Sequence, residues 1–136
     1  MNSFEILEHK ADLKIRVFGK TKEALFLNAV LGMEECMRPE IKKPEEKTRR
    51  NITVESIDLN SLLVDFLSEI LYLIQIKREI YERIRFEEFS DFKIKAKLFG
   101  KKIKRFGLDI KAVTYHQLDI RQKKDNSFEA EIIFDI

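Results

Sequence analysis

The amino-acid sequence predicts an α+β fold: a two-layer sandwich in which two main helices pack on one face of a mostly antiparallel or mixed sheet. Two long stretches, residues 22–37 and 59–77, repeat apolar residues at helical spacing. Several shorter stretches alternate apolar and polar residues, which is typical of strands with one solvated face. Most strands follow one another directly in the sequence, and this order favours antiparallel pairing.

The N-terminal third is predicted to hold two strands and the first helix. Residues 4–8 and 13–18 are the strands, and the second alternates apolar with charged side chains. Thr21 is a suitable N-cap for a helix over residues 22–37. Pro39 ends this helix, because the residue before a proline avoids the helical region.

The middle of the chain is predicted to hold a charged loop, a short strand and the second helix. Residues 40–50 are highly charged and contain a proline, so we expect a loop there, followed by a strand over 51–56. Asp58 is the expected N-cap of the helix, which ends near residue 77 or 78. Its apolar stripe, typical of core packing, consists of Leu59, Leu62, Leu63, Phe66, Leu67, Ile70, Leu71 and Ile74.

The remainder of the chain is predicted to be entirely β. Strands are expected over 80–86 and 92–98, the latter with one lysine face (Lys93, Lys95 and Lys97) and a turn at 100–102. Residues 103–109 are not assigned to an element. Residues 110–136 form a predicted hairpin, with its turn at Asp125-Asn126. The alternation slips at His116-Gln117, which predicts a β-bulge there.

Length and composition indicate one domain, residues 1–136, with a substantial core. Hydrophobic residues make up 44% of the chain, which excludes a disordered class. The 26 basic and 24 acidic residues nearly balance, so no nucleic acid or membrane partner is required. A lone Cys36 in a helical pattern predicts a buried, inert thiol and a cytoplasmic location. We expect no transmembrane helix and no signal peptide.

Two carboxylates stand at the ends of predicted strands and are far apart in the sequence. Asp12 begins one strand and Asp135 ends the last strand, each on the side opposite the apolar residues. If the two strands are neighbours, these carboxylates meet, and oxygen ligands of this kind suit a hard cation such as calcium. From spacing alone, two ordinary carboxylates are the favoured interpretation, because aspartate is common at strand ends.

The two histidines, His9 and His116, allow a zinc site or acid–base chemistry, but neither has a standard zinc spacing. Hydrogen-bonded polar histidines are the simpler interpretation. The sequence also contains no phosphate-binding glycine loop, no recognisable nucleophile arrangement and no RNA-recognition aromatic motif. It therefore offers no self-sufficient active site.

Five segments together resemble the archease family, whose members are protein partners of RtcB-type tRNA-splicing ligases. The resemblance covers nearly the whole chain, although each motif alone is weak. The segments are Glu8-His9-Lys10-Ala11-Asp12, Ile15 to Thr21, Asp58 to Glu69, Ile110 to His116 and Phe134-Asp135-Ile136. Two departures stand out: Lys10 replaces the family's usual threonine, and a histidine expected near Phe106 is absent.

This resemblance implies a non-enzymatic cofactor that helps an RtcB-type RNA ligase to load guanylate from GTP and to turn over repeatedly while it joins tRNA halves. The ligase is then the direct protein partner, tRNA is reached only through it, and no membrane is involved. The resemblance also implies a divalent metal, commonly calcium, held by Asp12, Asp135 and the main-chain oxygens of Ile136.

Two other classes of function remain open from the residues themselves. One is an RNA-binding or chaperone-like module that uses the lysine face of residues 93–97 and binds RNA in a salt-sensitive manner. The other is a metal-dependent hydrolase that uses His9, His116 and the carboxylates.

Overall fold

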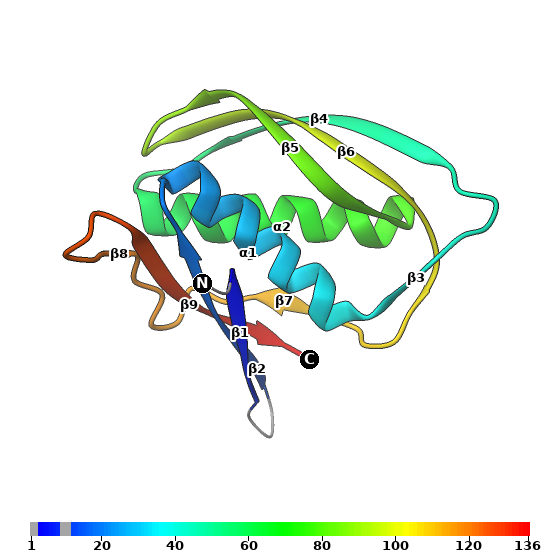
Figure 1. Ribbon diagram of the computed structural model, residues 1–136, viewed down its shortest axis with the longest axis horizontal. Coiled ribbons are helices and arrows are strands. Elements are labelled where there is room, and N and C mark those ends of the chain that lie inside the picture. The colour runs from blue at the N-terminus through cyan, green and yellow to red at the C-terminus, as the bar shows by residue number, and fades with distance from the viewer. Residues whose placement is uncertain (1–2, 9–11) are drawn as a thin grey trace.

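The computed structural model describes residues 3–8 and 12–136. Two antiparallel sheets enclose a layer of two helices (Figure 1). The predicted α+β class, the antiparallel pairing and the two main helices are confirmed. The layering differs from the expected two-layer sandwich, because the strands divide into two sheets and the helices lie between them.

The first sheet joins the two ends of the sequence. Its strand order is β1-β2-β9-β7, and the short β8 also pairs with β9. The bounds are β1 Phe4–Glu8, β2 Asp12–Gly19, β7 Ala112–Val113, β8 Arg121–Gln122 and β9 Phe128–Asp135. The predicted C-terminal hairpin is therefore only partly formed: β8 and β9 flank the expected turn, in which Asn126 adopts φ 70°, while residues 114–120 leave the sheet.

The second sheet has the order β3-β6-β4. The strand β5 also pairs with β6, over residues 94–102 of β6. Its strands are β3 Pro39–Ile41, β4 Lys47–Glu55, β5 Glu79–Phe89 and β6 Lys93–Phe106. The loop expected over 40–50 is therefore wrong for most of its length. Residues 42–46 do form a loop between β3 and β4, and the charges of residues 40, 47, 49 and 50 belong to strand side chains.

The turn expected at residues 100–102 is also wrong, because β6 runs straight through it. Gly100 is present for a different reason. A Cβ atom added there would lie only 1.7 Å from the carbonyl oxygen of Ile80, so glycine permits the close approach of β5.

Both helices begin and end where the sequence predicts. Helix α1 is Lys22–Met37 and helix α2 is Leu59–Lys77. The hydroxyl of Thr21 accepts a hydrogen bond from the backbone N–H of Ala24 at 3.0 Å, and the carboxylate of Asp58 accepts one from Ser61 N–H at 2.7 Å. Arginines rather than glycines adopt the left-handed C-cap conformation, with φ 48° at Arg38 and 55° at Arg78.

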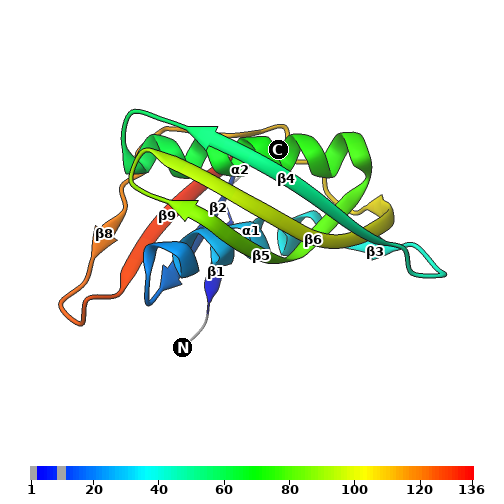
Figure 2. The same ribbon diagram turned by 90° about the horizontal axis from the view of Figure 1, so that it is seen from above.

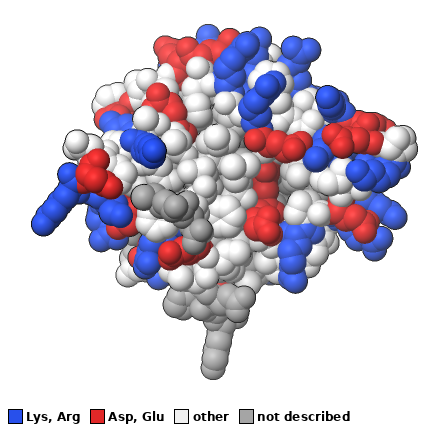
Figure 3. Space-filling view, in the orientation of Figure 1, with Lys and Arg blue, Asp and Glu red and all other residues white. Residues whose placement is uncertain are grey.

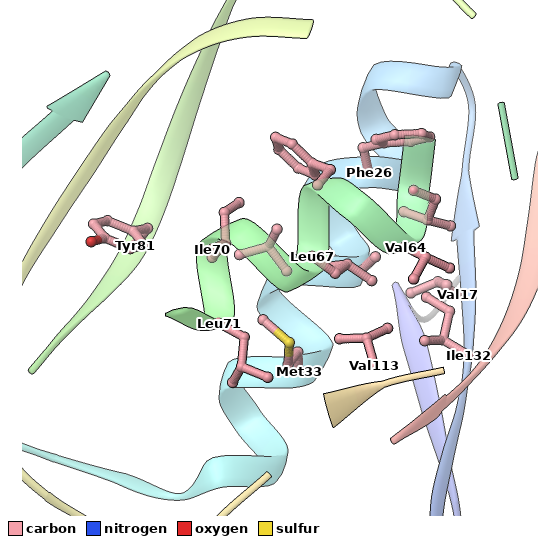
Figure 4. Packing of buried hydrophobic residues seen from close by; sticks show 14 of the residues in the cluster. Val17, Phe26, Met33, Val64, Leu67, Ile70, Leu71, Tyr81, Val113 and Ile132 are labelled. Atoms are coloured by element: carbon pink, nitrogen blue, oxygen red, sulfur yellow. The ribbon is translucent and has the colours of Figure 1, made fainter. Parts of the chain in front are cut away.

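The core is one continuous cluster that takes side chains from both sheets and both helices (Figure 4). Phe26 of α1 and Phe66 of α2 lie with ring centroids 5.7 Å apart. Both helices are buried on more than one side, and this is why a sheet covers each side of the helix layer. By length and composition alone, α2 meets the criteria for a membrane-spanning helix, contrary to expectation, but buried core helices share these properties.

Two bulges in β5 keep the core regular. The register with β6 shifts between Tyr81 and Arg83 and again between Phe86 and Glu88. Each shift places an additional charged residue on the solvent side, so the aromatic residues Tyr81, Phe86 and Phe89 all remain directed to the core.

Candidate metal centre

Asp12 and Asp135 are directly opposite each other in the antiparallel pair of β2 and β9. Their neighbours Leu13 and Phe134 are buried in the core, so both aspartates project from the outer face of the sheet. The Cβ atoms of residues paired in this way lie about 5 Å apart. The expectation that these two carboxylates meet at neighbouring strand ends is therefore confirmed.

The Asp12 carboxylate has an oxygen with no hydrogen-bond partner. Within residues 3–8 and 12–136, its Oδ1 is buried and accepts no hydrogen bond. A buried oxygen of this kind normally has a donor or a cation beside it, because losing its hydration without compensation costs free energy. This atom is the clearest local sign that a cation fits the site.

Asp135 and Ile136 are fixed on both sides. β9 pairs with β2 along one edge, and along the other Ala112 of β7 stands opposite Asp135. The backbone N–H of Lys111 donates to the carbonyl oxygen of Asp135 at 2.7 Å. The Ile136 side chain, directly after β9, packs against the core.

The electrostatics of this face favour a cation. Two carboxylates directly opposite each other repel. Lys14, the next residue of β2 on the same face, lies 3.7 Å from Glu131. No lysine or arginine in the described part of the chain forms an ion pair with Asp12 or Asp135.

The donor set consists only of oxygen atoms. Among the described residues, no group of three or more His, Cys, Asp or Glu side chains is placed to hold a metal. A cation held by Asp12 and Asp135 therefore needs further oxygen ligands from the main chain and from water. Such a set suits a hard divalent cation, calcium above all, better than zinc.

Of the two histidines, only His116 lies in the described part of the chain, and it does not complete this site. His9 and Lys10 lie outside the described residues. His116 is exposed, and the β-bulge expected there is wrong. The chain instead forms a turn in which Leu118 N–H donates to the carbonyl of Tyr115 at 3.3 Å and Gln117 has φ 56°. The slip in alternation marks the point where the chain leaves the sheet.

Three hydrogen bonds made by residues of α2 were not predicted from the sequence. The hydroxyl of Tyr115 and that of Ser56 both donate to the carboxylate of Asp65 on α2. The hydrogen bond to Asp65 raises the pKa of Tyr115. Asn60 of α2 also accepts a hydrogen bond from Ile120 N–H at 2.9 Å. Helix α2 thus holds both ends of the segment that carries His116, a pairing that no local pattern reveals.

Cys36 is buried, as predicted. Burial raises the pKa of its thiol to about 11, with a smaller contribution from the charge of Glu35. The thiol therefore stays protonated at neutral pH and is a poor nucleophile.

Comparison with known proteins identifies the family. The profile of the Archease protein family (MTH1598/TM1083) matches residues 4–136. The Protein archease of Methanosarcina barkeri is 39% identical over 141 residues, covering 98% of this chain and 95% of that protein. The Protein archease of Thermococcus kodakarensis is 32% identical and covers both chains fully.

Two solved structures agree with this assignment. The solution structure of Methanobacterium thermoautotrophicum protein 1598 has a TM-score of 0.73 and 30% identity, with both chains fully covered. A crystal structure from Thermotoga maritima, titled an archease and "possible chaperone", has a TM-score of 0.66 at 24% identity and covers 96% of this chain and 94% of that one. The latter supports the fold alone. The chain belongs to the archease family.

Proposed function

We propose that this archease-family chain is a non-enzymatic cofactor of an RtcB-type tRNA-splicing ligase. It promotes GTP-dependent guanylylation of the ligase and so allows multiple turnover during the joining of tRNA exons. The ligase is its direct partner, and tRNA is engaged through the ligase in the cytoplasm.

The observation that carries this proposal is the in-register pair of Asp12 and Asp135 at the rim of the first sheet. Asp135 is exposed and Asp12 is half-buried, so the pair is accessible to the surface of a partner. A site made of two strand-end carboxylates is too open to enclose a substrate alone. It is well suited to insertion into the active site of another protein.

In this proposal, the residues of this chain contribute by holding oxygen ligands in place. The ladder between β2 and β9 fixes the backbone that carries the two carboxylates, and the Ile136 side chain packs against the core directly after β9. We propose that the main-chain oxygens of Ile136 complete the ligand set. A divalent cation bound there, with calcium as the candidate, neutralises the carboxylates and supplies a positive contact for a phosphate group. The bond between Tyr115 and Asp65 holds the neighbouring segment in place.

The test is an RNA ligation assay with substrate in excess over ligase. We expect this protein to increase the formation of the guanylated ligase from labelled GTP and to raise the number of ligation cycles above one per ligase. Ligation that stays at a single cycle, with guanylylation unchanged, would overturn the proposal.

Substitutions at Asp12 and Asp135 test whether this site carries the proposed function. We expect Asp12→Asn and Asp135→Asn each to abolish the stimulation, because each removes a charged oxygen ligand but keeps the side-chain shape. Glu129→Gln is the matched control, since it changes the charge at the opposite end of β9. Circular dichroism confirms that all three variants are folded. Full stimulation by Asp12→Asn would exclude the proposed site.

A further inference from the structure

The second sheet has an uncovered outer face rich in basic side chains. Figure 2 shows β4, β5 and β6 nearest the viewer, with the helices behind them. Figure 3 shows Lys and Arg side chains along the top of the molecule, where this sheet lies in Figure 1, with Asp and Glu side chains among them. The basic residues of the face are Lys47, Arg49, Arg83, Arg85, Lys93, Lys95, Lys97 and Lys101, and the acidic ones are Glu55, Glu82, Glu87 and Glu88.

The carboxylates form ion pairs with only some of these cations, although Glu88 also stands opposite Lys95 in the strand register. Lys93 lies 3.7 Å from Glu55 and from Glu88, and Lys101 lies 3.4 Å from Glu82. In the described part of the chain, no ion pair is formed by the basic residues at the centre: Arg49, Arg83, Arg85, Lys95 and Lys97.

The strand register places like charges beside each other at the centre. Lys97 is paired with Asn51 on one side and with Arg85 on the other. Directly opposed like charges destabilise a sheet, so the pairing of Lys97 with Arg85 does not stabilise the free protein. An anion bound over them would offset this repulsion.

An aromatic ring lies among these cations. Phe99 stands between Arg49 and Arg83, and the Arg83 guanidinium carbon lies 4.3 Å from the ring centroid. The ring is half-buried, and the lining of a hollow of about 590 Å³ beside it includes three basic residues, Lys47, Arg49 and Arg83, and two acidic ones, Glu45 and Glu82. Bases stack on aromatic rings, and a partly exposed aromatic within a cationic sheet face is a common way to bind a single strand.

We propose that the outer face of β4, β6 and β5 binds single-stranded RNA. Lys95, Lys97 and Arg85 contact successive phosphates, and one base stacks in the hollow at Phe99. The polar side chains of Asn51 and Thr53 lie beside these lysines in the sheet. Amide and hydroxyl groups pair with the 2′-hydroxyl, which distinguishes RNA from DNA.

The experiment measures fluorescence anisotropy of a labelled 12-nucleotide single-stranded RNA with the full chain and no ligase. We expect saturable binding that weakens with salt, with a slope of about −0.7 per phosphate contacted. DNA of the same sequence should bind several-fold more weakly. Equal binding of the DNA, or of an acidic peptide of the same charge, would overturn the proposal.

A charge-matched pair of variants tests the location. Arg85→Gln/Lys95→Gln/Lys97→Gln should weaken RNA binding at least tenfold and reduce the salt slope. The control Lys20→Gln/Lys43→Gln/Lys124→Gln removes the same charge from exposed residues elsewhere and should change binding less than threefold. Equal losses in the two triple variants would exclude a built site.

Phe99→Leu tests the stacking role separately. It keeps an apolar side chain, and it should weaken RNA binding at least fivefold without changing the salt slope. Unchanged binding would remove the proposed base contact. Because no ligase is present in these assays, they can fail while the proposed ligase function stands, and the reverse also holds.

Discussion

Each of the two sheets places two like charges opposite each other: the pair is negative on the first sheet and positive on the second. On the first sheet Asp12 faces Asp135, and on the second Lys97 faces Arg85. The helix layer separates the two outer faces (Figure 1). Each arrangement costs free energy in the isolated protein. The two proposals above assign a cation to the first pair and an RNA phosphate to the second.

The rest of the first sheet shows that the fold is able to neutralise charge where no ligand is needed. Arg16 lies 3.4 Å from Glu5 and 3.7 Å from Glu131, and Arg121 lies 3.6 Å from Glu129. Asp12 and Asp135 therefore differ from the other charged residues on the outer face of β2 and β9, which form ion pairs.

The largest effect should come from the core that joins the two sheets. Phe66 is fully buried and contacts Phe26 and Phe86, so Phe66→Ala should lower the free energy of unfolding by about 3–5 kcal/mol. Urea unfolding should remain a single transition, because both sheets share this core. The exposed Tyr72 of the same helix is the control, with a change of about 0.5 kcal/mol on Tyr72→Ala. Two separate transitions in the parent protein would contradict a shared core.

The next effect concerns the cation side of the comparison. Calcium at 1,000 times its dissociation constant should raise the free energy of unfolding by about 4 kcal/mol. Thermal melts with calcium or a chelator measure this directly. Asp12→Asn and Asp135→Asn should lose the increase, whereas Glu129→Gln keeps it.

Without calcium, each of these two aspartate variants should be slightly more stable than the parent, because the repulsion between the carboxylates is gone. An undiminished calcium effect in Asp12→Asn would refute the site.

A smaller, pH-dependent effect should come from Glu34, which ties α1 to the second sheet. Glu34 is buried and accepts a hydrogen bond from Tyr81 N–H at 2.6 Å. Burial raises the pKa of Glu34 to about 8, against an ordinary value of 4.5, with a smaller contribution from the charge of Glu82. The unfolded chain therefore releases this proton between pH 4.5 and 8 while the folded chain retains it. The contribution of Glu34 to stability falls as the pH rises through this window and is constant above it.

Glu34→Gln removes this pH dependence and keeps an acceptor for Tyr81. Relative to the parent, the variant should gain about 1–3 kcal/mol of stability between pH 5 and pH 8, measured by urea unfolding at each pH. The exposed neighbour Glu35 is the control through Glu35→Gln. Parallel pH profiles for Glu34→Gln and the parent would show that Glu34 does not titrate in this window.

The smallest effect should come from the cation pair of the second sheet. Lys97→Gln removes the repulsion from Arg85 and should stabilise the free protein by about 0.2–1 kcal/mol, an effect that high salt reduces. Lys93→Gln is the matched control on the same strand, because Lys93 has carboxylate partners, and its loss should be neutral or destabilising. Equal effects from both lysines would remove the distinction between paired and unpaired cations on this face.

Local patterns predicted both helices and their caps well. Thr21 and Asp58 have side chains that bond to the backbone a few residues later, and these contacts depend on little else. The same patterns failed at Gly100 and over residues 40–50. Glycine and clustered charge also occur within strands, where close approach of a neighbour or a solvated face requires them.

The candidate site was also predicted from the sequence only in part. Strand alternation alone placed Asp12 and Asp135 off the apolar face, and the structure confirms this. Sequence could not show that the two residues are partners in register, nor that Asp65 holds Tyr115. These contacts join residues 50 or more positions apart, and no local periodicity encodes their register.

By itself, the sequence determined the fold class, the two helices and the side of the strand on which each charge lies, because these depend on side-chain period and local hydrogen bonding. Only the tertiary structure decided that the strands form two sheets around the helices, and hence that the carboxylates and the unpaired cations face opposite directions. The physical reason is that a helix buried on several sides can be covered by one sheet or by two, and only the packing of the whole chain selects between these arrangements.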